Sequence, residues 1–325
     1  MLVPPTVHWI FPILSLSIPF LVIFNLMYLI FLLIRHPQKA LFIFLAVLAA
    51  IPFIAVTFQW NKSHGNPHDL LLLSYNVHTF VPRGEVKNSK AMVEWLIESK
   101  ADILCLQEYH SFDETGKFEA TKWIQKHYDH KYIANFKPDN MHINRGLAFF
   151  SKFPIIHQGI VRTTRKNHLN GVVFADFHIN GDTIRIYNLH LESMRINEKN
   201  LGDTRDIPEE TKGLILKLRN GMYMRALQLE AVRAHIAACT HPVILAGDFN
   251  DLPYSYNYFS LKENFNNAFE HRGRGFGFTY NGYLFFLRID NHFFSDDFEV
   301  THFDVIRSYK KSDHFPVIAG YRLKK

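Results

Sequence analysis

Six apolar segments of this sequence end in polar residues of the types that carry out catalysis. The clearest runs from Val243 to Pro253, where an apolar run ends at Gly247 and is followed by Asp248 and Asn250. In an extended chain side-chain direction repeats every second residue, so Asp248 and Asn250 would point the same way. Together they offer an acid or base and an orienting amide over one small volume. Alone, the segment also fits a buried strand followed by an ordinary Asp-rich turn.

Other segments of this kind supply oxygen ligands for a hard divalent cation. Carboxylates are rarely buried unless they are paired or bind a metal. Mg²⁺, or Mn²⁺ in its place, prefers oxygen ligands to sulfur. Glu108, Asp313 and the amide oxygen of Asn76 are such ligands. The two cysteines, Cys105 and Cys239, are too few for a zinc site or a disulfide framework, which leaves oxygen as the predicted ligand type.

The same residues fit the attack of water on a phosphate ester. Such a reaction needs a group that orients or deprotonates the water, and Asp248 fits this role. The phosphate oxygens need neutral donors, which Asn250 and Asn188 provide. Arg145 could add a charged contact to the phosphate, although a surface arginine is more often simply solvated.

Two histidines complete the set of predicted catalytic residues. His190 follows a strand-like segment, and His314 follows Ser312 and Asp313 directly. Histidines can donate a proton to a developing charge or to a leaving group. Asp290 is predicted to hold His314 as a cation or in the required tautomer.

Two apolar runs near the N-terminus predict a transmembrane hairpin within residues 1–60. The runs at 7–34 and 40–58 contain no Asp, Glu, Lys or Arg, and a bilayer takes about 20 residues to cross. The basic loop between them favours the cytoplasm, so both ends of the hairpin would face outward. We therefore expect an integral membrane protein whose larger part lies outside the cytoplasm, on the periplasmic side of a bacterial cytoplasmic membrane. A cleaved signal peptide fits less well, because a basic n-region is missing and a second span follows.

Strands and helices alternate through the rest of the chain, which predicts an α/β domain at 70–325 after a polar linker at 61–69. Asn180-Gly181 between two strand-like segments is a strong hairpin signal. The chain holds 36 Lys and Arg against 30 Asp and Glu. This mildly basic balance suits an anionic substrate or surface but is far from that of a nucleic-acid packaging protein.

These motifs, taken in order, resemble the endonuclease/exonuclease/phosphatase superfamily, which includes DNase I. The resemblance covers residues 70 to 321. It is carried by Asn76, Gln107-Glu108, Asn188-x-His190, Gly247-Asp248-x-Asn250, Arg288-Ile289-Asp290 and Ser312-Asp313-His314. It implies a DNase I-like four-layer α/β sandwich, here preceded by the two transmembrane helices.

The resemblance also implies roles for the matched residues. Glu108 would bind Mg²⁺ with Asn76 beside it, and Asp313 would be a further ligand. Asp248 would position or deprotonate the water, and Asn250 would hold the phosphate. The remaining catalytic residues would be the pair Asp290 and His314, together with His190.

The predicted activity is that of a membrane-anchored, Mg²⁺-dependent phosphodiesterase resembling the nucleases. One alternative is a sphingomyelinase-like phospholipid phosphodiesterase, for which aromatic residues at 280–286 would lie beside the site. A phosphatase acting on a soluble phosphate monoester, and a domain that binds without cutting, are further alternatives. His78 stands where abasic-site endonucleases have Asp, which argues against a repair role. The expected partners are thus a nucleic acid or phospholipid substrate and the lipid bilayer, and no protein partner is inferred.

Overall fold

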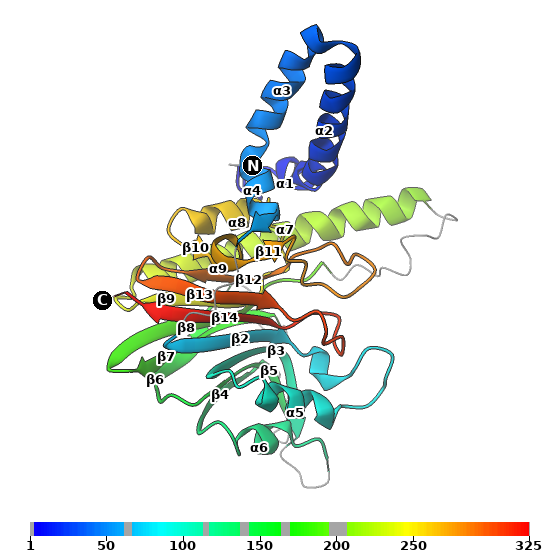
Figure 1. Ribbon diagram of the computed structural model, residues 1–325. Coiled ribbons are helices and arrows are strands. Elements are labelled where there is room, and N and C mark those ends of the chain that lie inside the picture. The colour runs from blue at the N-terminus through cyan, green and yellow to red at the C-terminus, as the bar shows by residue number, and fades with distance from the viewer. Residues whose placement is uncertain are drawn as a thin grey trace.

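Two six-stranded sheets form the centre of the molecule (Figure 1). The computed structural model describes residues 3–61, 67–112, 117–136, 143–163, 170–194 and 207–324, so most of the predicted linker 61–69 lies outside the described residues. The first sheet has the strand order β13–β14–β2–β3–β5–β4. In that order its strands are Phe298–Val305, Val317–Leu323, Leu70–Asn76, Ile103–Phe112, Ile143–Ser151 and His130–Asn135.

The second sheet has the order β10–β12–β9–β8–β7–β6. Its strands are Asn266–Asn267, Asp290–Phe294, Val243–Asp248, Asp182–His190, Gly171–Ile179 and Ile155–Val161. Each sheet is mixed, because β2 runs parallel to β3 and β8 runs parallel to β9, whereas the other neighbours are antiparallel. The predicted hairpin at Asn180-Gly181 joins β7 to β8, with both residues at positive φ.

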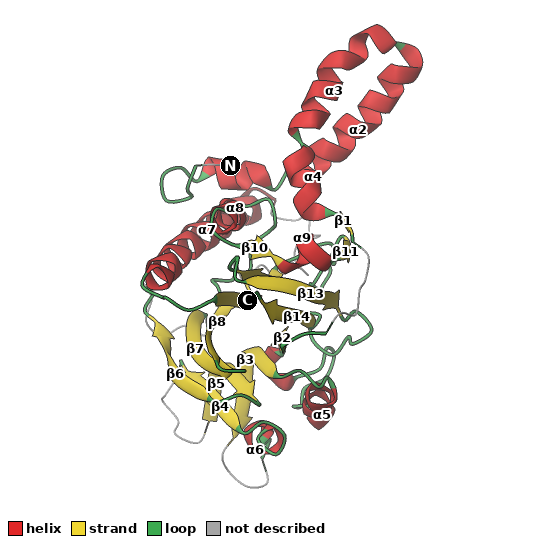
Figure 2. Ribbon diagram, turned by 60° about the vertical axis from the view of Figure 1, so that its left-hand side comes forward, coloured by secondary structure: helices red, strands yellow, loops and turns green. Residues whose placement is uncertain are grey.

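Helices cover the outer faces of the two sheets and give four layers (Figures 1 and 2). Apolar side chains such as Leu72, Phe149 and Ile186 fill the space between the sheets. The first sheet is covered by α5 (Lys90–Glu98) and α6 (Ala120–Ile124), whose apolar residues join those on its outer face. The second is covered by α7 (Ile207–Ala237) and α8 (Tyr256–Lys262). The α/β fold with two packed sheets is therefore confirmed.

Strand register brings the predicted catalytic residues to one edge of the sandwich. In the second sheet Asp248, at the end of β9, lies opposite His190 on β8 and Asp290 on β12. In the first sheet Asn76, at the end of β2, lies opposite Gln107 on β3. Carboxyl ends of parallel strands share an edge, which is why residues far apart in the sequence meet there.

Gly247 allows β8 and β9 to approach closely at this edge. Its φ is +144°, and a Cβ atom there would lie 2.1 Å from the carbonyl oxygen of Leu189. We expect Gly247→Ala to lower the free energy of unfolding by about 3 kcal/mol or more, because backbone strain and a backbone clash combine. Urea denaturation measures this change.

The matched control is Gly213→Ala, in the helix α7, where the added Cβ would meet nothing within 4 Å. This change should stabilise the protein by about 0.5–1 kcal/mol, because alanine loses less backbone entropy in a helix. Equal effects of the two substitutions would contradict the close approach of β8 and β9.

The N-terminal residues form a helical hairpin that projects from the sandwich (Figure 1). The hairpin consists of α2 (Ile18–Arg35) and α3 (Ala40–Ala49), with a short 3-10 turn η1 (Pro37–Lys39) between them, and α4 (Ile51–Thr57) leads from α3 to the domain. The preceding helix, α1 (Ile10–Ser15), lies against the domain, where it contacts α7. Only α2, among the described helices, is by itself long and apolar enough to cross a membrane.

The predicted first span, 7–34, is interrupted between α1 and α2. The predicted second span, 40–58, bends by 49° between α3 and α4 and qualifies only if the bent pair is one span. Each break comes just before a proline near the start of a helix, Pro19 and Pro52, where the ring is tolerated because the first N–H groups have no helical partner.

Candidate active site

Asp248 lies at the centre of the site and is almost fully buried. One of its carboxylate oxygens, Oδ1, accepts the backbone N–H of Asn250 at 2.8 Å. The other, Oδ2, accepts the side-chain amides of Asn76 and Asn250, each at 3.2 Å. Asn250 can make the local bond because its φ is +50°, a conformation that asparagine tolerates better than most residues. The carboxylate is therefore held in one orientation by donors from two sheets.

The pKa of Asp248 is raised, because burial disfavours its charged form. The nearby rings of His314 and His190 oppose this shift, and the carboxylate of Asp290 adds to it. A buried carboxylate with a raised pKa is a stronger base than one in water, which suits a group that takes or orients a proton of water.

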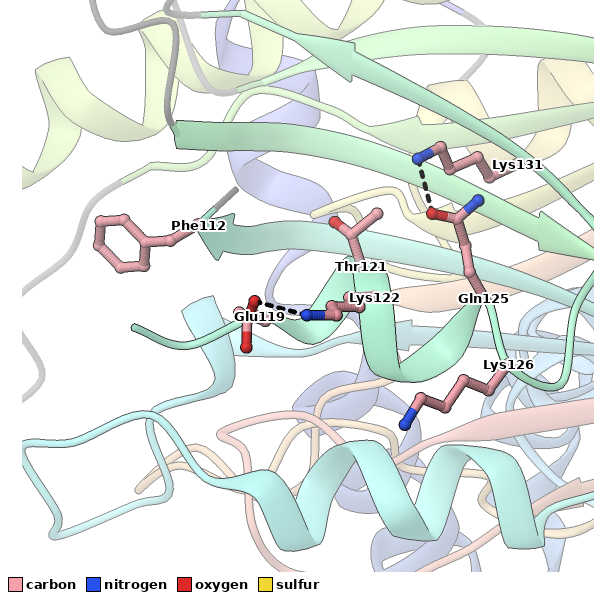
Figure 3. A pocket seen from close by; sticks show the side chains of 7 residues that line it. All are labelled: Phe112, Glu119, Thr121, Lys122, Gln125, Lys126 and Lys131. Atoms are coloured by element: carbon pink, nitrogen blue, oxygen red, sulfur yellow. Dashed lines mark hydrogen bonds and ion pairs between the residues drawn. The ribbon is translucent and has the colours of Figure 1, made fainter. Parts of the chain in front are cut away.

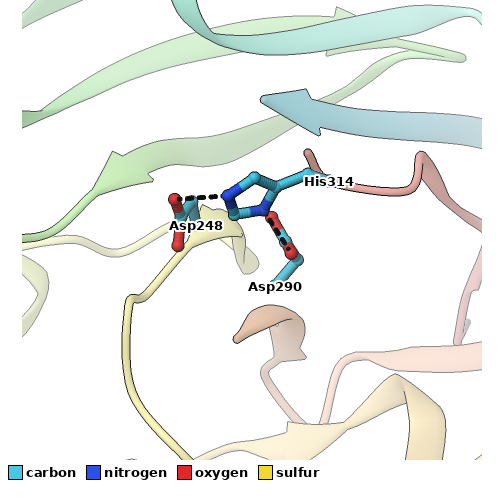
Figure 4. A group of neighbouring side chains, drawn as sticks. All are labelled: Asp248, Asp290 and His314. Carbon is cyan, nitrogen blue, oxygen red and sulfur yellow. Dashed lines mark hydrogen bonds and ion pairs between the residues drawn. The ribbon is translucent and has the colours of Figure 1, made fainter. Parts of the chain in front are cut away.

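His314 forms a hydrogen-bonded pair with Asp290 next to Asp248 (Figure 4). Its Nδ1 lies 2.9 Å from Oδ2 of Asp290, and its Nε2 lies 3.6 Å from Oδ2 of Asp248. Burial opposes a charge on the ring, but the two carboxylates outweigh it and hold the pKa of His314 well above its usual value. The two carboxylates thus favour the cationic form of the ring, which can stabilise negative charge or donate a proton.

Glu108 and Asn76 form the second half of the site, across from His314. The amide of Asn76 donates to Oε1 of Glu108 at 3.3 Å as well as to Asp248, so it links the two carboxylates. His190 lies between them, with Nε2 at 3.8 Å from Glu108 and 3.6 Å from Asp248. Glu108 interrupts the register of β3 and has a φ of +50°, a strained conformation that turns its side chain to the edge of the sheet.

The donor set on this side fits a hard divalent cation. Glu108 is partly exposed, and its Oε1 lies 3.3 Å from the amide nitrogen of Asn76 and 3.8 Å from Nε2 of His190. The oxygen of Asn76, the atom that could bind a cation, accepts the backbone N–H of His78. Ligand atoms of Asp248, Asp290 and His314 also lie within 4.8 Å of one another. In that group the ring nitrogens of His314 face Asp290 and Asp248, so the ring would have to be neutral to bind a cation there.

Asp313 lies at the rim of the site, next to His78. Its Oδ1 is 3.5 Å from Nδ1 of His78 and accepts the hydroxyl of Ser312 at 3.1 Å. Burial would raise the pKa of Asp313, but His314 and His78 outweigh it, so the pKa is lowered. The same Ser312 hydroxyl contacts the backbone oxygen of Asn76 at 2.8 Å, which ties this rim to β2.

The other two predicted phosphate contacts, Asn188 and Arg145, make no described contact with the residues of this cluster. Asn188 is fully buried between the sheets, where its amide donates to the carbonyls of Leu106 and Ala148 and its oxygen accepts from Gln107. Its described bonds are thus structural, because they join β8 to β3 and β5. Arg145 lies on β5 opposite His110, whose pKa is lowered by burial and by this arginine. A phosphate contact remains a prediction for both residues.

Sequence reasoning missed the support for Asp290. The hydroxyl of Thr279 accepts the backbone N–H groups of Ile289 and Asp290, at 3.0 and 3.1 Å. The next residue, Tyr280, forms an isolated β-bridge with His314, and the two rings meet edge to face at 5.5 Å. The sequence signal for this support was Thr279, a polar residue between the aromatic residues Phe278 and Tyr280. Only the fold shows that its hydroxyl contacts the backbone of Asp290.

A separate hollow of about 350 Å³ lies beside α6 on the outer layer (Figure 3). None of the predicted site residues lines it. Its lining residues are Phe112, Glu119, Thr121, Lys122, Gln125, Lys126 and Lys131. The catalytic cluster is therefore distinct from this lysine-rich surface.

The family of the chain follows from comparison with known proteins. The model of the endonuclease/exonuclease/phosphatase family matches residues 73–314, a range that begins in β2 and ends at His314. The chain belongs to this family. Members of it hydrolyse phosphoester bonds and include nucleases, phosphodiesterases and phosphatases. A second model, a domain of unknown function, matches residues 1–57, and no curated protein matches the chain.

Solved structures confirm the fold. A family protein from Beutenbergia cavernae DSM 12333 is 18% identical, with a TM-score of 0.60 over 79% of this chain and 72% of that one. A humanized TDP2 from D. rerio is 17% identical, with a TM-score of 0.56 over 78% and 98%. The human Nocturnin catalytic domain, solved with a bound sulfate anion, is 14% identical, with a TM-score of 0.54 over 80% and 96%.

Proposed function

We propose that the protein is a membrane-anchored, Mg²⁺-dependent phosphodiesterase. The observation that supports this most is the continuous contact from Glu108 through Asn76 and Asp248 to the His314–Asp290 pair. A base, a cationic donor and oxygen ligands for a cation meet within one small volume at one sheet edge. These are the parts that attack of water on phosphorus needs.

In this proposal Asp248 orients and accepts a proton from the attacking water. His314, held as a cation by Asp290, stabilises charge on the phosphate or protonates the leaving oxygen. Asn250 lies beside Asp248 and offers its amide to the phosphate, at the cost of its present bond to the carbonyl of Leu191. His190, within 4 Å of both Glu108 and Asp248, is the second donor.

Glu108, with Asn76 beside it, would hold the Mg²⁺ ion, or Mn²⁺ in its place, and Asp313 at the rim would be a further ligand. A bound divalent cation polarises a phosphoryl oxygen and lowers the pKa of water. The chain contributes a partly exposed carboxylate at a strained position, which the amide of Asn76 holds in place.

We expect Glu108→Gln to raise the Mg²⁺ concentration for half-maximal activity by about tenfold or more, because a charged oxygen ligand is lost. Titration of activity with Mg²⁺ after treatment with a chelator measures this shift. Glu98→Gln, on the surface helix α5, is the control and should leave the titration unchanged. Equal titrations for both variants would place the cation elsewhere.

The anchor in this proposal is the N-terminal hairpin, with α2 as one span and the bent pair of α3 and α4 as the second. Apolar side chains such as Phe24, Ile34 and Phe42 are largely exposed, which suits a lipid environment. Arg35 and Lys39 lie at the turn and would face the cytoplasm. The catalytic domain would then lie on the periplasmic side.

The substrate is a phosphodiester, and nucleic acid and phospholipid are the two candidates. The test is hydrolysis by the detergent-purified full chain of plasmid DNA, sphingomyelin and phosphatidylcholine in parallel, with Mg²⁺ and with chelator. Metal-dependent cutting of one class identifies it. No turnover of any of these, or of a soluble phosphate monoester, would favour a domain that binds without cutting.

A further inference from the structure

The foot of the N-terminal hairpin is built into the catalytic domain. Val56, in α4, is buried among core residues of the second sheet. Its carbonyl oxygen, at the end of the helix, accepts a bond of 2.6 Å from the buried guanidinium of Arg288. The next segment, β1 (Gln59–Trp60), pairs with β11 (Arg274–Gly275). These contacts fix the hairpin relative to the domain, so they also fix which face of the domain turns toward the hairpin.

Exposed aromatic residues lie on both sides of this β1–β11 pair and beyond it. Phe58 meets Phe276 edge to face at 5.1 Å, which joins the end of the hairpin to the loop between β11 and β12. Figure 1 shows that loop in orange, extending sideways from β11, which lies near the foot of the hairpin. We call this set the aromatic surface. Its members are Phe58, Trp60, Phe276, Tyr283, Phe285 and Phe286, which are between 37% and 78% exposed.

We propose that the aromatic surface is a second contact of the protein with the lipid bilayer. The inference rests on the proposed membrane anchor, whose foot is joined to the surface through Phe58, Trp60 and Phe276. Phe285 and Phe286 lie further along the loop that begins at Phe276. Contiguous exposed apolar residues mark contact sites, whereas single ones are ordinary. Aromatic rings with arginine beside them are typical of the bilayer interface. Arg274 lies 5.9 Å from the Trp60 ring, and Arg307 lies 5.6 Å from the ring of Phe278, which stacks on Phe276.

The loop that carries this surface is also bonded to the active site. Tyr280 bridges to His314, and the backbone N–H of Asn281 donates to the carbonyl of Asp313 at 2.6 Å. Thr279 holds the backbone of Asp290. Contact of the loop with a bilayer would therefore hold the catalytic edge at the membrane surface. This deepens the proposed function, because it favours phosphodiesters of lipid headgroups as substrate.

Stacking on the bases of a single-stranded nucleic acid is the rival use of exposed aromatic rings. Such sites combine the rings with a positively charged groove along the backbone. Here the rings continue from the foot of an apolar hairpin. The bilayer therefore accounts for the position of the surface as well as for its composition.

The test measures the depth of single fluorophores in the full chain, reconstituted into phosphatidylcholine vesicles with a doxyl-labelled quencher lipid. A bimane label is placed at Phe286→Cys in a Cys239→Ser background, because the other cysteine, Cys105, is fully buried. Phe24→Cys on α2 is the positive control. Ile156→Cys on β6, an exposed apolar position like Phe286, is the matched negative control.

We expect quencher lipid to lower the fluorescence at position 286 about twofold, as at position 24, with little change at 156. Quenching at 24 but not at 286 overturns the second contact and leaves the anchor intact. No quenching at 24 overturns the anchor and the inference together. If the label at position 286 is quenched by a single-stranded oligonucleotide in the absence of lipid, the second membrane contact is also overturned.

A second measurement tests the consequence for catalysis. The double variant Phe285→Ser, Phe286→Ser should keep the wild-type kcat/KM for soluble bis(p-nitrophenyl) phosphate. Its kcat/KM should fall about tenfold for sphingomyelin or phosphatidylcholine in vesicles. The reason is that the aromatic side chains that would be buried in the bilayer no longer hold the active site at the membrane surface. An equal loss on the soluble ester would instead mean that the loop only supports the active site.

Discussion

Asp248→Asn is expected to lower kcat by about 10³-fold, because it removes the base that orients and accepts a proton of the attacking water. Asparagine keeps the size of the side chain and one oxygen, which can accept the two side-chain amides that Oδ2 now accepts from Asn76 and Asn250. The backbone N–H of Asn250 would lose its bond to Oδ1. Burial raises the pKa of Asp248, so the charged carboxylate is costly to the folded state. We therefore expect the melting temperature of the variant to stay the same or to rise.

The contrasting variant is Asp176→Asn in β7, which is far from the catalytic edge in the sheet register. Asp176 is buried and accepts two bonds from Arg185, at 2.6 and 2.7 Å. Breaking such a pair should cost about 3 kcal/mol of stability, whereas the folded variant should keep its kcat. Loss of stability with Asp248→Asn and of activity with Asp176→Asn would reverse our assignment.

Asp290→Asn is expected to move the alkaline limb of the pH–activity profile to lower pH by about one unit or more. Burial alone would lower the pKa of His314, and the carboxylates of Asp290 and Asp248 raise it well above its usual value. Because the active form is the cation, activity is present below the folded-state pKa and is lost as the pH rises through it. Without the charge of Asp290 that loss begins at a lower pH, and we also expect kcat to fall about 100-fold at neutral pH.

The profile of kcat against pH, measured on a soluble phosphodiester, checks this shift. Asp304→Asn is the control, because Asp304 is an exposed carboxylate on β13 that lies opposite Ile318 on β14, away from His314 in the sheet register. It should leave the alkaline limb in place. An unchanged limb in Asp290→Asn would show that His314 is not the group whose proton sets it.

The position of the catalytic cluster could be predicted because each residue is adjacent to an apolar strand. Asp248 and His190 end neighbouring parallel strands, and Asp290 begins the next strand of the sheet. Strand ends are visible in a sequence as a change from apolar to polar residues. The same signal cannot show how far a side chain lies from the sheet edge. That is why Asn188, two residues before the end of β8, was expected at the phosphate although its described bonds join the two sheets.

Contacts between distant segments could not be predicted from sequence patterns. Arg288 and Val56 are 232 residues apart, and nothing near either one indicates that a buried arginine caps the last helix of the hairpin. The packing of the two sheets on each other also could not be predicted from sequence patterns. The alternation of strands and helices predicts α/β structure, but it does not show which sheet faces pack together. Here the resemblance to a family carried the prediction of four layers, and the structure bears it out through two mixed sheets covered by helices.

The most direct test of the central claim is the hydrolysis of bis(p-nitrophenyl) phosphate by the full chain in ¹⁸O-labelled water. We expect a reaction that needs Mg²⁺, stops with a chelator and is largely lost in Asp248→Asn. We also expect one ¹⁸O atom in the product p-nitrophenyl phosphate, because water attacks phosphorus. Hydrolysis at an unchanged rate in the presence of the chelator would contradict metal-assisted attack at phosphorus by the cluster around Asp248. So would finding the ¹⁸O label in p-nitrophenol instead.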